Sequence, residues 1–292
     1  MKKNLIKKLA LSAVTMGVAA VTVTTTTYAW FTANQSATAT GINADVTAAD
    51  EGNLMVSKTG TAGSWGPSIS FGTSGVTMMP VQRTATGYKT LDGENDTTGV
   101  FLTYTVYFNV SDLPSQGGEL YMSLGDMEFS AAKTMTLLQD AGTDPSAKNG
   151  QQVTVSLADV LNMQVKKVAD VTGVAYTENT YRYLAETNAN AVGPDALTYY
   201  NNVMHLETSL ERPTSNYTFG ATALYTPAAN EASATYNEIK LADVSSSTAT
   251  FGMTFTFFID GWDAQCFNAI GGQGITAGQF NFRLAKKTAN NG

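Results

Sequence analysis

Two stretches of strict alternation constrain the fold of this chain more than any other feature. In residues 100–110 the apolar side chains fall at every second position, at Leu102, Tyr104, Val106, Phe108 and Val110. Residues 250–259 repeat this period with Phe251, Met253, Phe255, Phe257 and Ile259. Because successive side chains of a β-strand point to opposite faces, each stretch predicts a strand with one apolar face.

Shorter alternating runs predict further strands. They are Leu120–Leu124, Phe280–Leu284 and two weaker candidates, Leu54–Val56 and Val76–Val81. Pro114 and Gly117-Gly118 form a short connection between residues 100–110 and Leu120–Leu124. This spacing predicts that these two strands pair antiparallel.

The middle of the chain, about 130–248, is less regular. Ser156 is a candidate cap for a short helix over Leu157–Leu161, and Met163, Val165 and Val168 suggest another strand. Residues 170–200 are polar and Tyr-rich, while 211–248 are rich in Ala, Ser, Thr and Asn. We therefore predict an all-β protein, an antiparallel β-sandwich over 48–285 with little helix and a loop-rich insertion over about 130–248. A basic, disordered tail is expected over 286–292.

The N-terminus is typical of an export signal. Four lysines precede an apolar run of about fifteen residues, Leu9–Val23, which is short for a membrane span of roughly twenty. Small residues at Thr27 and Ala29 predict a signal peptide over 1–29 with cleavage between Ala29 and Trp30. The protein is then secreted or held at the cell surface, with membrane contact during export only. An uncleaved membrane anchor is the alternative.

The charge balance argues against nucleic acid and anionic membranes as partners. The chain has 17 basic and 24 acidic residues, a net charge of −7, and only 14% of its residues are charged. Loss of the four signal lysines brings the charge to about −11. Such a surface repels phosphates instead of binding them.

The single cysteine, Cys266, excludes an intramolecular disulfide, which fits an exported protein of Gram-positive type. A small buried apolar role is favoured for Cys266 over a reactive or intermolecular thiol.

Catalytic motifs are missing from the sequence. The only histidine, His205, has apolar neighbours, and there is no His-Glu-x-x-His zinc motif, Gly-x-Ser-x-Gly elbow or phosphate-binding loop. We therefore assign no catalytic residues and no cofactor. Hydrolysis by two carboxylates distant in sequence stays open as an alternative.

Two acidic clusters are candidates for calcium. The first is Asp92, Glu94 and Asp96, and the second is Asp260 and Asp263. Neither completes a calcium-loop signature, and turns hold Asp for backbone reasons, so no metal site is predicted.

Aromatic residues offer a possible glycan-binding surface. Trp65, Trp262 and the Tyr-rich stretch 176–200 would carry it in a monomeric adhesin or glycan-binding module. A core position for Trp262 at the end of a strand is the favoured reading.

The junction Tyr28-Ala29-Trp30-Phe31-Thr32 resembles the TasA/camelysin group of Gram-positive exported proteins, and the Phe-rich strand followed by Trp262 looks like the late strand of that group. The junction combined with the later Asp260-Gly261-Trp262-Asp263-x-x-Cys266 element resembles a broader set of exported proteins from Gram-positive anaerobes. The resemblance covers about 1–45 and 250–284. It implies cleavage by a dedicated signal peptidase of the SipW type, a jelly-roll-like sandwich and assembly into extracellular fibres. Camelysin-like members have been described as proteases, but no recognisable protease site is present, and that activity is not carried over.

In such a fibre the freed N-terminal segment adds as a strand to the next subunit. Residues 30–47 suit this role because their one charge is Asp45, and Ile42, Ala44 and Val46 alternate with polar residues. Trp30 and Phe31 would be the anchors. The resulting hypothesis is a secreted structural protein that self-associates into a surface or biofilm-matrix fibre.

Overall fold

The computed structural model describes residues 42–49, 52–71, 78, 80–83, 87–90, 101–136, 150–184, 223–227, 235–261, 263, 266, 270 and 273–287. Within them the chain is all-β, as predicted, and its one helix is a single turn, α2 (Leu157–Val160). The strands are β1 (Ile42–Ala49), β2 (Asn53–Ser57), β3 (Ser68–Ser70), β4 (Pro80–Arg83), β5 (Tyr88–Thr90), β6 (Leu102–Ser111), β7 (Gly118–Phe129), β8 (Lys133–Thr136), β9 (Gln152–Val155), β10 (Leu161–Lys167), β11 (Val174–Tyr176), β12 (Asn179–Leu184), β13 (Ala223–Thr226), β14 (Thr235–Tyr236), β15 (Ile239–Val244), β16 (Ala249–Asp260) and β17 (Ile275–Lys286).

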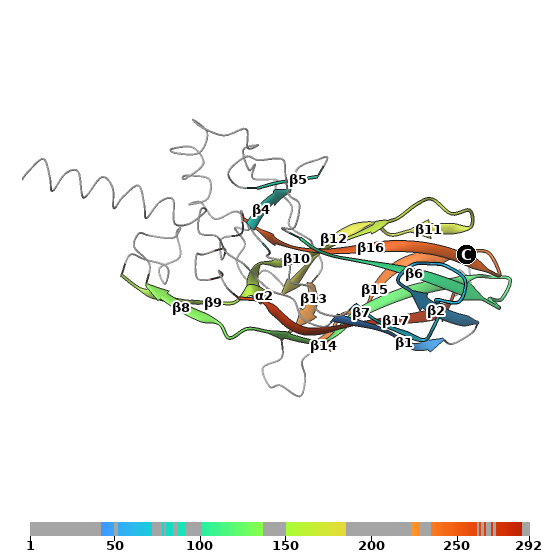
Figure 1. The fold of residues 1–292 in the computed structure, drawn as a ribbon, viewed down its shortest axis with the longest axis horizontal. Helices are drawn as coiled ribbons and strands as arrows, with labels where there is room; N and C mark the ends of the chain where they lie inside the picture. The colour runs from blue at the N-terminus through green and yellow to red at the C-terminus, as the bar shows by residue number, and fades with distance from the viewer. Residues whose placement is uncertain are drawn as a thin grey trace, which may run out of the picture.

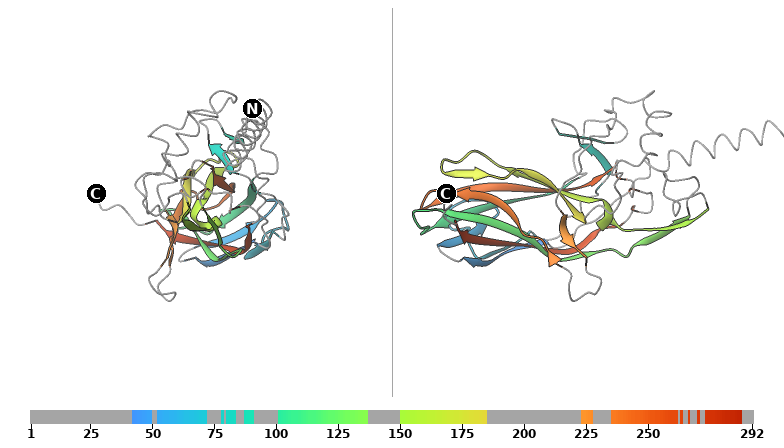
Figure 2. Two further views of the ribbon diagram at one scale, coloured as in Figure 1. Left: turned by 90° about the vertical axis from the view of Figure 1, so that its left-hand side faces the viewer. Right: turned by 180° about the vertical axis from the view of Figure 1, so that it is seen from behind.

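Two sheets form an elongated sandwich (Figures 1 and 2). One sheet, here called the β7 sheet, has the order β11-β15-β7-β17-β1-β3. The other, the β16 sheet, has the order β14-β13-β12-β10-β16-β4-β5, with β6 also beside β16 and β2 beside β6. A separate β8–β9 hairpin extends from one end in Figure 1. Most pairs are antiparallel, as expected, while β1–β17, β12–β13 and β4–β16 are parallel. A jelly-roll topology stays a prediction.

The core lies between the inner faces of the two sheets. Along β6 buried residues alternate with more exposed ones, as the sequence pattern predicts. Aromatic rings from both sheets meet there: the ring centroids of Phe108 and Phe282 are 4.8 Å apart, and those of Phe255 and Phe280 are 5.0 Å apart. Burial of these rings removes much apolar surface from water and holds the layers together.

The strongest local predictions are confirmed. Residues 100–110, 250–259 and Phe280–Leu284 lie in β6, β16 and β17, respectively. Ser156 caps α2: its side chain accepts a hydrogen bond from the Ala158 amide, and Asp159 completes a capping box. The predicted helix and the strand after it therefore have the expected local chemistry.

The predicted pairing of β6 with β7 is wrong. These strands lie in opposite sheets, where β6 pairs with β16 and β2, and β7 pairs with β17 and β15. The connection passes through a turn closed by a hydrogen bond from the Gly117 amide to the Pro114 carbonyl, at 2.8 Å. Six residues can cross the ~10 Å between packed sheets, and the alternation of a strand does not specify its neighbour.

The interval 130–248, expected as a loop-rich insertion, contributes to both sheets. β10 lies between β12 and β16, and β15 lies between β11 and β7. Met163, Val165 and Leu241 are fully buried in the core. These strands are difficult to recognise in the sequence because they are short, so their periodicity is weak, and because polar segments separate them.

Candidate assembly site

The first strand of the described chain lies beside the last one. β1 pairs in parallel with β17, with Ile42 opposite Gly278 and Val46 opposite Phe282. Its other edge pairs with β3 through residues 43–45. The candidate assembly residues Ile42 and Ala44 are completely buried, and Val46 is half-buried against the core. The structure therefore brings three of the candidate residues together on the inner face of one strand.

A glycine makes room for this strand. A Cβ at Gly278 would lie 3.5 Å from Cγ1 of Ile42 and in collision with Sδ of Met127. The absence of a side chain at Gly278 thus lets Ile42 and Met127 approach β17 closely.

Polar contacts fix the register of β1 on its outer side. The Gln279 side-chain amide donates to Oδ2 of Asp45 at 2.6 Å, and the Val46 amide donates to the Pro67 carbonyl at 2.8 Å. The Phe71 amide donates to the Ile42 carbonyl at 3.1 Å. The first bond ties β1 to β17, and the other two tie it to the segment around β3, so both edges of β1 are held in one register.

The link from β1 to β2 passes from one sheet to the other through Gly52. Its φ of +87° favours glycine, and a Cβ there would lie 2.8 Å from the Ser111 carbonyl oxygen. Next to it, the Asn53 side-chain amide donates to Oδ2 of Asp112 at 2.6 Å. Gly52 is therefore packed against the end of β6.

Several other candidate residues from the sequence lie outside the described part of the chain. Ala29, Trp30 and Phe31, including the predicted cleavage position, lie outside the described residues. The same holds for His205, Trp262, the cluster at Asp92, Glu94 and Asp96, and residues 185–200. In the described part of the Tyr-rich stretch, Tyr181 and Tyr183 are buried, and Tyr176 is half-buried. Trp65, which lies between β2 and β3, is also half-buried.

The Asp-Gly-Trp-Asp-x-x-Cys element contributes buried polar groups. Asp263 is buried, and its Oδ2 accepts a hydrogen bond from Nη2 of Arg182 at 2.6 Å. Arg182 also donates to the Asp159 carbonyl at 3.2 Å. A guanidinium thus occupies the side of Asp263 where a cation would bind. No cluster of three or more potential metal ligands occurs in the described part of the chain.

Cys266 is buried in the same element. Burial, followed by the charges of Asp263 and Asp260, raises the pKa of its thiol well above the usual value. The thiol therefore stays protonated, which is the state of a structural cysteine and not of a reactive thiolate. This agrees with the interpretation favoured from the sequence.

Sequence reasoning missed Arg182, because it assigned 170–200 to an excursion from the core. The signal was present: Tyr181 and Tyr183 alternate with Arg182 in β12, and all three residues are buried. Two tyrosines on either side of an arginine predict a strand that presents the aromatic rings on one face and the guanidinium on the opposite face.

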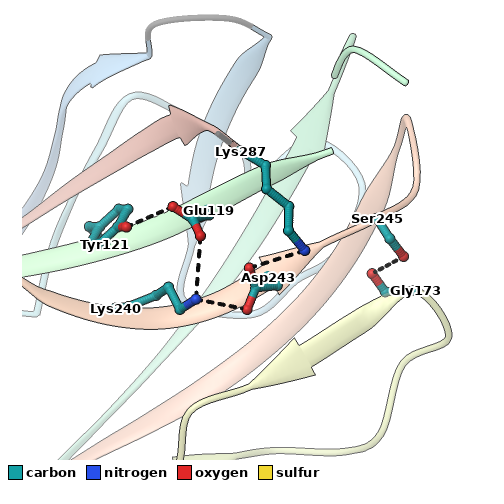
Figure 3. Close-up of polar contacts among 7 residues, drawn as sticks. All are labelled: Glu119, Tyr121, Gly173, Lys240, Asp243, Ser245 and Lys287. Atoms are coloured by element: carbon teal, nitrogen blue, oxygen red, sulfur yellow. Dashed lines mark hydrogen bonds and ion pairs between the residues drawn. The ribbon is translucent and has the colours of Figure 1, made fainter. Parts of the chain in front are cut away.

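The outer face of the β7 sheet carries an ion-pair network (Figure 3). The Lys240 ammonium contacts Glu119 at 3.3 Å and Asp243 at 3.0 Å, and Lys287 contacts Asp243 at 3.5 Å. Burial acts to raise the pKa of Asp243, but the two lysines outweigh it and lower that pKa. The Tyr121 hydroxyl donates to Glu119 at 2.7 Å. The network joins β7, β15 and the residue after β17.

Within the described residues, no helix combines the length and apolar character that a membrane crossing requires. Comparison of the chain with models of known protein families, with curated proteins and with solved structures finds no significant match.

Proposed function

We propose that this chain is a secreted structural protein, a subunit of an extracellular surface or matrix fibre. In this proposal the subunits associate by strand addition, and β1 is the strand that one copy supplies to the next. The observation that carries the proposal is the position of β1 in the β7 sheet.

β1 is positioned as an added strand would be. It lies parallel to β17, more than two hundred residues away in the sequence, and its buried side chains alternate along one face. Its successor β2 belongs to the other sheet, so the chain leaves the β7 sheet directly after β1. A β1 from a second copy could make the same contacts with β17 and β3, as in domain swapping.

Because each subunit donates a strand in one direction, the exchange produces an open-ended row of subunits. Each copy gives its β1 to a neighbour and receives another, so donor and acceptor surfaces differ. A head-to-tail contact of this kind does not close unless the rotation between subunits closes it, and it otherwise produces a filament. Main-chain hydrogen bonds supply affinity, and the pockets for Ile42 and Ala44 supply specificity.

The link through Gly52 is the hinge that the exchange must open. Gly52 is packed against Ser111 and Leu113, and the Asn53–Asp112 hydrogen bond lies directly beside it. Exchange is therefore slow where this packing is intact. We expect the variant Asn53→Ala, which removes that bond and leaves Asp112 with its φ of +57° unchanged, to assemble faster in light-scattering time courses.

A reversible disulfide tests the proposal directly. Asp45 and Asn281 are paired residues on β1 and β17, and strands spaced ~4.8 Å apart meet the Cα separation that a disulfide requires. The double variant Asp45→Cys/Asn281→Cys, oxidised as a monomer, ties β1 to its own subunit. We expect it to form no fibres in electron micrographs until a reductant is added. Asp45→Ser/Asn281→Ser is the control and should assemble like the parent chain.

Oxidation after assembly gives the complementary result. The disulfide then joins different subunits, and a non-reducing denaturing gel should show a ladder of multimers. Fibres formed by the oxidised monomer would contradict the exchange of β1. A parent chain that stays monomeric in size-exclusion chromatography and electron microscopy would contradict the fibre proposal as a whole.

A further inference from the structure

A hairpin of two strands stands apart from both sheets. β8 follows β7 after three residues, and among the described residues β8 and β9 pair only with each other. This hairpin, here called the arm, extends beyond the end of the sandwich (Figures 1 and 2). The side chains of Thr134, Thr136, Gln152 and Thr154 along it are exposed. Because a hairpin alone is only marginally stable and its outer edges offer main-chain donors and acceptors, the arm is suited to receive a third strand.

The base of the arm is fixed to the start of β17. Nε2 of Gln273 donates to the Val155 carbonyl at 3.0 Å, and Oε1 of Gln273 accepts from the Leu157 amide at 2.8 Å. The Ser130 amide donates to the Gly274 carbonyl at 2.8 Å. Since Gln273 is buried, its bonds are shielded from water. The fold therefore sets the position of the arm relative to β17.

The chain that leads into β1 arrives from the end of the sandwich that carries the arm. β1 runs parallel to β17, and its first residue, Ile42, lies opposite Gly278. The three residues of β17 before Gly278 lead back to Gln273 and the base of β9. Residues that precede Ile42 as a continuation of β1 therefore pass beside the start of β17 and reach the arm.

Residues 30–41 have the length and the composition for this path. Twelve residues span ~40 Å as a strand. The path beside 273–277 and the whole of β9 takes nine residues. The segment contains no charged residue and no proline, and four of its residues are Ser or Thr. Such a segment can add to an open edge through main-chain hydrogen bonds.

We propose that residues 30–41 dock on the arm as its third strand, parallel to β9. β7 is antiparallel to β17, β8 extends β7 away from the sandwich in Figure 1, and β9 is antiparallel to β8. β9 and β1 therefore run in the same direction. The docked segment brings Trp30 and Phe31 to the outer end of β9, near Gln152.

This docking goes beyond the proposed exchange of β1 and does not depend on it. In a subunit that keeps its own β1, the segment docks on the arm of the same chain. Where β1 lies on a neighbour, the segment before it docks on the neighbour's arm, because the arm is fixed to the same β17 that β1 contacts. The alternative occupant of the open edge is the arm of a second copy.

Paired cysteines test the docking in the chain that begins at Trp30, which retains every described residue. Thr154→Cys is combined in turn with Asn34→Cys, Gln35→Cys and Ser36→Cys, because adjacent strands ~4.8 Å apart place facing Cα atoms within disulfide range. We expect at least one pair to form a disulfide under mild oxidation, identified by mass spectrometry of the linked peptides. Thr250→Cys, at an exposed position near the start of β16, replaces Thr154→Cys in the matched control and should form none. The native Cys266 is buried and should stay reduced.

The chains that the disulfide joins separate the two proposals. A disulfide within one chain supports docking in a subunit that keeps its own β1, and a disulfide between chains supports docking together with exchange. Dimers linked through Thr154→Cys alone would assign the open edge to the arm of a second copy and overturn the docking.

Hydrogen exchange gives a second readout without cysteines. A variant that lacks residues 30–38 also retains every described residue. We expect the amides of β8 and β9 to exchange about tenfold or more faster in this variant than in the chain that begins at Trp30, while the amides of β16 stay unchanged. Unchanged exchange in the arm, or no disulfide from Thr154→Cys to any of the three positions, would overturn the proposal. Equally ready disulfides from Thr250→Cys would also overturn it.

Discussion

Tyr104 carries a hydroxyl into the core between the sheets. It is 5% exposed, and its hydroxyl has no hydrogen-bond partner among the described residues. Burial raises the pKa of this phenol well above its usual value. Its ring packs edge-on against Phe280, with centroids 5.8 Å apart. The ring thus contributes to the core, while the hydroxyl costs free energy.

Removing that hydroxyl should stabilise the protein. We expect Tyr104→Phe to raise the free energy of unfolding by about 1 kcal/mol, because an unsatisfied buried hydroxyl costs ~1–3 kcal/mol. Urea denaturation followed by tyrosine and tryptophan fluorescence measures the change.

Tyr121→Phe is the matched comparison. The Tyr121 hydroxyl donates to Glu119 at 2.7 Å, and this bond is the main reason that the pKa of Tyr121 is raised. Its loss should lower the free energy of unfolding by roughly 0.5–1.5 kcal/mol. A destabilised Tyr104→Phe would show that the hydroxyl has a partner.

At the scale of elements, the turn between β6 and β7 carries the chain from one sheet to the other. Gly117 has a φ of +83°, and a Cβ there would collide with the carbonyl oxygen of Val244. The turn therefore needs glycine both for its backbone conformation and for its close approach to the end of β15.

We expect Gly117→Ala to lower the free energy of unfolding by more than ~2 kcal/mol, because strain and collision add. Gly63→Ala is the control, since Gly63 has the same φ of +83° but no neighbouring atom within 4 Å. Gly63→Ala should lower the free energy of unfolding by the backbone strain alone, about 1 kcal/mol. Equal losses in urea denaturation of the two variants would mean that the approach to Val244 does not matter.

For the whole molecule, one aromatic cluster joins the two layers. Phe280 of the β7 sheet lies 5.0 Å from Phe255 and 5.9 Å from Phe257 of the β16 sheet, measured between ring centroids. Neither sheet buries its apolar face without the other. We therefore infer that the described sandwich unfolds as one cooperative unit.

Phe280→Ala should lower the free energy of unfolding by about 3–5 kcal/mol. Near-ultraviolet circular dichroism, which reports aromatic packing, and far-ultraviolet circular dichroism, which reports strands, should still give one shared transition. Met55→Ala, at an exposed position, should change the stability by no more than ~0.5 kcal/mol. Two separated transitions would contradict the single cooperative unit.

The sequence by itself determined the local structure where its periodicity was strong. Alternation placed β6, β16 and β17, because burial of one face of a strand requires an apolar residue at every second position. The Ser156 cap was readable, since its bond reaches only two residues along the chain. The candidate residues Ile42, Ala44 and Val46 were also readable as one face of a strand, from the same period.

Only the tertiary structure decided which strands are neighbours. It separated β6 from β7 and placed β1 in parallel beside β17. It also joined Arg182 to Asp263 across 81 positions of sequence. The physical reason is that a strand's own pattern states which face is buried, whereas its partner is chosen by long-range packing. The sequence carries no local record of that choice.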